Sequence, residues 1–136
     1  AHLARLCPGD YFAINAYVEM NDANHRLLQG IRHVVRDAKH VATTLGFGPR
    51  FLHSTGQLHK GGPNSGVFLQ ITSDDAADLP IPGMKSTFGL VKRFQAEGDF
   101  DVLAKRHRRV LRVHLGADVE AGLSSLREQV QRATLG

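Results

Sequence analysis

The sequence predicts an α/β domain with a mostly parallel sheet of about four strands, covered by helices on both faces. Short apolar segments alternate with segments of helical spacing, which is the pattern of such a sheet. No repeat, low-complexity tract or linker divides the 136 residues, and this length suits one domain with its own core. The hydrophobic share of 42% is that of a folded globular protein.

The strands are predicted from four compact apolar segments. The first contains aromatic and branched residues in an almost unbroken run, which is typical of a strand buried on both faces. The second is short and ends at two glycines, and the third is the strongest of the four. In chain order the predicted strands are residues 11–18, 41–45, 67–71 and 110–115.

The helices are predicted from apolar residues at helical spacing between these strands. One helix follows the cap candidates Asn21 and Asp22, and a final helix follows Asp118. Between them, residues 88–96 have a helical pattern, and residues 99–105 add another turn or two. Ligands of parallel sheets bind beyond the carboxyl ends of the strands. We therefore expect a site in the loops at residues 19–24, 46–53, 72–78 and 116–118.

The composition restricts the classes of partner that the chain is expected to bind. The 17 Lys and Arg exceed the 13 Asp and Glu, so the surface attracts anions. Charge alone does not choose between a nucleic acid and a small phosphorylated ligand, but the chain has no Trp and two Tyr, which argues against base stacking. No apolar run is long enough to cross a bilayer, so no membrane partner is expected. Cys7 has no disulfide partner, which fits a cytoplasmic location.

Residues 46–64 concentrate the reactive side chains. This run holds two His, an Arg, a Lys and five Gly. Imidazole exchanges protons near neutral pH, and Arg and Lys hold phosphate or an oxyanion. His53 and His59 are six residues apart without nearby Cys or acidic ligands, so no metal site is expected. Composition alone is equally compatible with an ordinary loop.

The order of residues in this run resembles a known family. Residues 52–62 read Leu-His-Ser-Thr-Gly-Gln-Leu-His-Lys-Gly-Gly and resemble the L-H-S-x-G-Q segment of phosphoglucose isomerases. Residues 42–64 are closer still to the isomerase portion of bacterial bifunctional transaldolase/phosphoglucose isomerases. Supporting similarities lie at residues 79–82, 87–89 and 109–116. The resemblance implies the sugar-isomerase (SIS) fold, a three-layer α/β/α sandwich.

The resemblance also implies an activity and its context. Such an enzyme interconverts glucose 6-phosphate and fructose 6-phosphate without a cofactor, by opening the sugar ring and moving a proton through an enediol. Residues 1–136 would be one SIS domain, the C-terminal piece of a longer protein, and incomplete as an enzyme by itself. The expected partners are the sugar-phosphate substrate, the other SIS domain with its phosphate pocket, a transaldolase domain, and further copies in a homo-oligomer.

Site residues follow from matching motifs. His53 matches the family's ring-opening histidine, and either Lys92 or Lys60 takes the place of a late catalytic lysine that has no match here. The expected substrate-binding residues are Arg50, Ser54, Gln57, His59 and Lys60. The Glu-Ser-x-Gly-Lys context of the family's base is missing, which leaves Asp37, Glu19 or an upstream carboxylate. The alternative function is a SIS module that binds a sugar phosphate without turning it over.

Overall fold

A computed structural model describes residues 2–48, 59–74, 82–83 and 88–135. The sheet has four parallel strands in the order β2-β1-β3-β4. They are β1 (Tyr11–Tyr17), β2 (Ala42–Phe47), β3 (Gly66–Thr72) and β4 (Arg109–His114). The predicted parallel sheet of about four strands is therefore confirmed.

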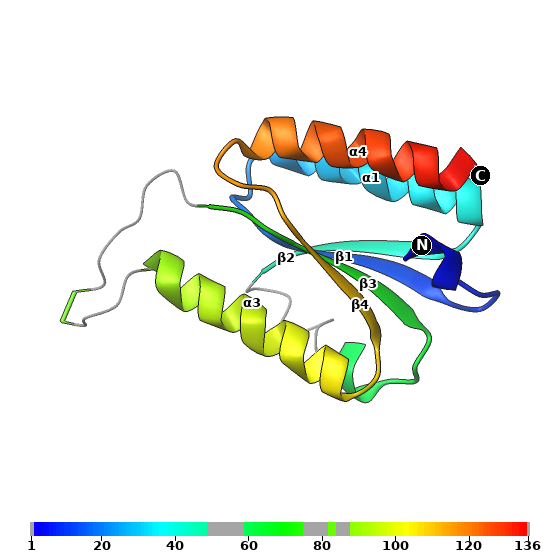
Figure 1. Ribbon diagram of the computed structural model, residues 1–136, viewed down its shortest axis with the longest axis horizontal. Coiled ribbons are helices and arrows are strands. Elements are labelled where there is room, and N and C mark those ends of the chain that lie inside the picture. Colours follow the sequence, from blue (N-terminus) through cyan, green and yellow to red (C-terminus); the bar gives the residue numbers. More distant parts are fainter. Residues whose placement is uncertain (1, 49–58, 75–81, 84–87, 136) are drawn as a thin grey trace.

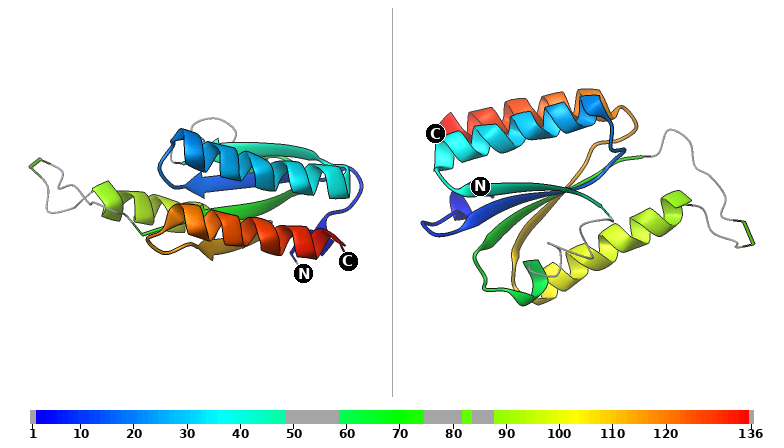
Figure 2. Two further views of the ribbon diagram at one scale, coloured as in Figure 1. Left: turned by 90° about the horizontal axis from the view of Figure 1, so that it is seen from above. Right: turned by 180° about the vertical axis from the view of Figure 1, so that it is seen from behind.

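Three long helices cover the sheet. Helices α1 (Asp22–Lys39) and α4 (Val119–Leu135) lie side by side on one face, and α3 (Phe88–Lys105) lies on the other (Figures 1 and 2). A short 3-10 turn, η1 (Leu3–Arg5), precedes β1. None of these described helices is long and apolar enough to span a membrane.

Helix ends follow the predicted capping residues. The Asn21 side chain accepts a hydrogen bond from the Asn24 backbone N–H at 2.8 Å, and the Asp118 carboxylate accepts one from the Ala121 N–H at 3.1 Å. Helix α3 contains both the predicted helical stretch at residues 88–96 and the further turns at residues 99–105, and it runs unbroken through Gly98. A glycine inside a helix costs about 0.5–1 kcal/mol relative to alanine, which the packing of Leu103 and Ala96 against the sheet offsets.

The face under α1 and α4 holds the main hydrophobic core. Alternate residues of the two central strands point to it, and all of them are buried: Phe12, Ile14, Ala16, Val67, Leu69 and Ile71. Leu28 and Ile31 from α1 and Leu123 from α4 close over these strand residues and are fully buried. This face is a dry core.

The face under α3 changes character along the strands. Near the amino ends, Ala13, Phe68 and Leu103 form a small apolar cluster. Toward the carboxyl ends, alternation brings polar residues onto the same face, and Asn15, Gln70 and Arg112 stand in register across β1, β3 and β4. Since its other face lines the core, β1 is buried on both faces, as predicted.

Candidate functional site

A cavity of about 370 Å³ opens at the carboxyl edge of the sheet, between α3 and the ends of β1, β3 and β4. Parallel sheets bind their ligands at this edge, and the volume lies within the range of small-molecule sites. The polar residues that line the cavity are Tyr17, Thr72, Ser73, Asp74, Lys92, Arg93, Glu97, Arg112 and His114. Basic side chains therefore gather where the fold favours ligand binding.

Arg112 is held in place from two sides. Its Nε donates a hydrogen bond to Gln70 Oε1 at 2.9 Å, and its guanidinium lies 4.7 Å from the centre of the Phe100 ring. Gln70 is fully buried in β3, and its Nε2 donates to the Ala96 carbonyl at 2.8 Å. Both ends of the Gln70 amide are thus engaged, which aims its oxygen at Arg112.

His114 lies between two partners at the mouth of the cavity. Its Nε2 is 3.0 Å from Asp74 Oδ1, and its Nδ1 is 2.9 Å from Thr72 Oγ1. Because an ionised carboxylate only accepts hydrogen bonds, Nε2 of His114 donates to Asp74, while Nδ1 and the threonine hydroxyl share the second hydrogen bond. About half of each of the His114 and Asp74 side chains is exposed, so a ligand can reach the pair.

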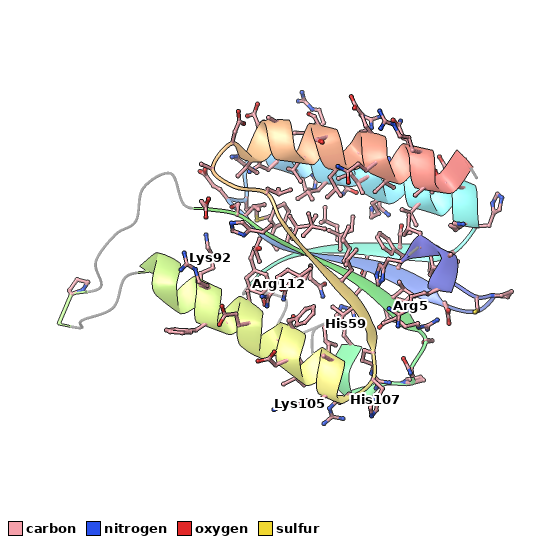
Figure 3. All side chains as sticks on the ribbon, in the orientation of Figure 1. Arg5, His59, Lys92, Lys105, His107 and Arg112 are labelled. Carbon is pink, nitrogen blue, oxygen red and sulfur yellow. The ribbon has the colours of Figure 1, made fainter. Side chains whose placement is uncertain are left out.

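His59 lies on the same face of the sheet, nearer the other end of α3 (Figure 3). It is buried, and its Nδ1 is hydrogen-bonded to the Tyr11 hydroxyl at 2.9 Å. Its ring stacks on Tyr11 and tilts against Phe68, with centroids 5.7 and 4.9 Å apart. A side chain at Gly66 would collide with Phe68, so the glycine makes room for this ring cluster. Burial lowers the pKa of His59, and the nearby charges of Asp99 and Lys60 act in opposite directions.

Lys60 is paired with a buried carboxylate. Its Nζ lies 2.8 Å from Asp99 Oδ1, and the Asp99 side chain is 2% exposed. Asp99 is the one buried acidic residue in the described part of the chain, where its Oδ2 has no hydrogen-bond partner. The carbonyls of Lys60 and Gly62 accept hydrogen bonds from Arg108 at 3.0 and 2.6 Å. This segment is therefore tied both to α3 and to the residue before β4.

The pKa of Tyr17, the last residue of β1, depends both on burial and on the charge of Asp99. Burial raises the pKa of its hydroxyl, and the neighbouring Asp99 carboxylate raises it further. Tyr17 lines the cavity, whereas Asp99 belongs to the buried pair. The two parts of the α3 face are therefore electrostatic neighbours.

The predicted site residues fall into three groups. Lys92 lines the cavity together with Arg93, near the first turns of α3, while His59 and Lys60 are not among the residues that line it. Lys92 and His59 lie toward opposite ends of α3 (Figure 3). Arg50, His53, Ser54 and Gln57 lie outside the described residues. The structure thus separates Lys92 from the His59 and Lys60 pair along α3, and the roles of all seven stay predictions.

The two carboxylates considered as the base also differ in position. Asp37 is on α1, across the sheet from the cavity, and is paired with Arg36 at 2.9 Å. Glu19 is exposed and follows the end of β1 at the ligand-binding edge. Of the two, only Glu19 stands on the same edge of the sheet as the cavity.

Four polar residues at or near the cavity were not predicted from the sequence: Gln70, Asp99, Arg112 and His114. A signal for three of them was present, because Gln70 interrupts an apolar strand, and Arg112 and His114 alternate along another. Residues two apart on a strand point to the same face of the sheet, so polar residues at this spacing indicate a polar face. Asp99 had no such signal, since acidic residues on helices are usually solvated. No group of three or more His, Cys, Asp or Glu within the described ranges is placed to hold a metal ion.

Comparison with known proteins adds one finding. No protein-family model matches the sequence, and no curated protein matches it. The structure is similar to the crystal structure of hypothetical protein TT0462 from Thermus thermophilus, with a TM-score of 0.75 and 17% sequence identity. The match covers 93% of this chain and 35% of that one. This likeness shows the fold. The chain corresponds to about a third of the length of that protein.

Proposed function

We propose that this chain is the C-terminal SIS domain of a phosphoglucose isomerase, part of a bifunctional transaldolase/phosphoglucose isomerase. It would interconvert glucose 6-phosphate and fructose 6-phosphate without a cofactor. The observation that carries the proposal is the segment at residues 52–62, which resembles the family in an unbroken run. A parallel α/β fold and a basic cavity at the ligand-binding edge support it.

The proposed chemistry assigns separate tasks to separate residues. His53 protonates the ring oxygen to open the sugar, because imidazole exchanges protons near neutral pH. A base then removes the proton from C2 of the open-chain sugar, and a lysine stabilises the negative charge of the resulting enediolate. Lys92 lines the cavity and Lys60 does not, so we assign this task to Lys92. Glu19 or a carboxylate from elsewhere in the protein serves as the base.

The test is replacement of His53 by Ala in the intact protein. We expect the isomerase rate on cyclic substrate to fall by about 10²–10⁴, the usual contribution of a general acid or base. His33→Ala is the matched control, because His33 is exposed on α1, across the sheet from the cavity. Transaldolase activity of the same polypeptide should stay unchanged in both variants, which controls for folding.

The outcome distinguishes two histidines. Near-normal activity of His53→Ala, together with loss of activity in His59→Ala, would show that the motif had been matched to the wrong residue. His59→Ala should also lower stability, because His59 is buried against Tyr11 and Phe68. Its activity must therefore be compared with its folded fraction.

A second candidate is a SIS module that binds sugar phosphate without turnover. The missing Glu-Ser-x-Gly-Lys context of the family's base favours it. In that case the intact protein would bind glucose 6-phosphate but release it unchanged, and His53→Ala would alter neither property. Isotope exchange at C2 of glucose 6-phosphate in heavy water separates the two candidates, because only an isomerase exchanges this proton.

A further inference from the structure

The cavity contains an arginine whose terminal amino groups are free for a ligand. The Arg112 guanidinium uses Nε to bond Gln70 and one face to contact Phe100. Among the described residues, Nη1 and Nη2 of Arg112 have no hydrogen-bond partner. Such a planar fork matches two oxygens of a phosphate group, and little side-chain freedom is lost when it binds. The arrangement resembles a prepared ligand-binding group more than a structural ion pair.

The charges around Arg112 favour an anion with polar substituents. Lys92 and Arg93 also line the cavity, against the two carboxylates of Asp74 and Glu97. The Asp74 carboxylate is engaged by His114. The basic side chains therefore exceed the acidic ones, and the Glu97 carboxylate can accept hydrogen bonds from hydroxyl groups of a ligand. A compact phosphate with an attached polyol fits both the charge and the volume of about 370 Å³.

We propose that this cavity binds a phosphate monoester, with Arg112 as the residue that binds the phosphate and Gln70 as the residue that positions Arg112. This site is additional to the phosphate pocket that the family resemblance assigns to the other SIS domain. It does not rest on the isomerase proposal, because binding can be measured without turnover.

The test must report on this cavity alone within the intact protein. Phenylglyoxal modifies accessible arginines, and mass spectrometry after digestion gives the rate for each one. Inorganic phosphate and glucose 6-phosphate should both slow the modification of Arg112 and Arg93, while glucose at the same concentration should not. Arg132, exposed in the last turn of α4, should react at the same rate throughout.

Two variants assign the roles. In Arg112→Gln, the phosphate concentration that half-protects Arg93 should rise about 10- to 100-fold, as expected for the loss of charge-assisted hydrogen bonds. In Gln70→Leu, that concentration should rise about tenfold. The modification rate of Arg112 without phosphate should also rise, because the guanidinium is released, while the rate of Arg132 stays unchanged. Partial unfolding would instead also raise the rate of Arg109, whose side chain is 17% exposed in the folded chain.

Two results would overturn the proposal. One is a wild-type protein in which millimolar phosphate fails to protect Arg112. The other is equal protection of Arg93 in Arg112→Gln and in the wild type. Protection that depends on Arg112 in a protein without isomerase activity would support this site while it refutes the isomerase proposal.

Discussion

The two faces of the sheet differ although they are built from the same strands. Ile14 and Asn15 are neighbours in β1, yet Ile14 lies in the dry core under α1 and α4, and Asn15 lies on the polar face under α3. The first face contains apolar side chains along its whole length. The second holds an apolar cluster at one end and hydrogen-bonded polar groups at the other. One face therefore supplies most of the hydrophobic stabilisation, and the other can hold buried polar groups.

The largest effect should come from breaking the buried ion pair on the polar face. Lys60→Met would leave the Asp99 carboxylate buried without its counter-ion, which costs about 3–5 kcal/mol of unfolding free energy. The double variant Lys60→Met with Asp99→Leu should recover most of this loss, because it removes both charges. Urea unfolding of the single and double variants measures the difference. Equal stability of the two would refute the role given to this pair.

A smaller effect should separate the neighbours Ile14 and Asn15. Ile14→Ala removes packed volume from the dry core and should cost about 3 kcal/mol. Asn15→Ala should cost about 1 kcal/mol or less, because the buried Nδ2 of Asn15 has no partner within the described part of the chain. Removing an unsatisfied polar group also removes the free-energy cost of desolvating it, and this gain offsets the packing energy lost with the side chain. Similar losses in the two variants would erase the contrast between the faces.

The smallest effect is a dependence of stability on pH. Burial lowers the pKa of His59 below its ordinary value of 6.5, so the unfolded chain binds a proton more readily than the folded one. Stability from this residue is fully present above pH 6.5 and is lost as the pH falls from there toward the folded pKa. His59→Phe should flatten the fall in unfolding free energy between about pH 7.5 and about pH 5.

A second histidine serves as a reference for this measurement. His2, whose pKa burial also lowers, should keep part of the acid dependence in the His59→Phe variant. An unchanged slope in His59→Phe would contradict the burial of a neutral imidazole.

The fold was more predictable than the site, for a physical reason. Strand and helix periods are local, so the apolar runs and the cap residues Asn21 and Asp118 indicated the elements that the structure contains. The helical pattern at residues 88–96 and the further turns expected at residues 99–105 form one helix, because packing against the sheet overrides the weak break at Gly98.

The polar network depends on register, which no local pattern contains. Gln70 and Arg112 meet because β3 and β4 align these two residues, and Lys60 meets Asp99 because α3 crosses back over the sheet. The sequence showed that these side chains exist but not which of them are neighbours. Lys92 was singled out from the sequence and lies in the cavity, while the motif residues Arg50, His53, Ser54 and Gln57 lie outside the described part.

The pairing of α1 with α4 has a consequence for how the chain folds during synthesis. These helices come from opposite ends of the sequence, and together they cover one face of β1 and β3 (Figure 2). A growing chain can form β1, α1 and β2 from local contacts, but half of that face stays open until α4 leaves the ribosome. Contacts between distant segments form late and slow the final step of folding. During that interval the apolar side chains of Val67, Leu69 and Ile71 are exposed and can associate with other nascent chains.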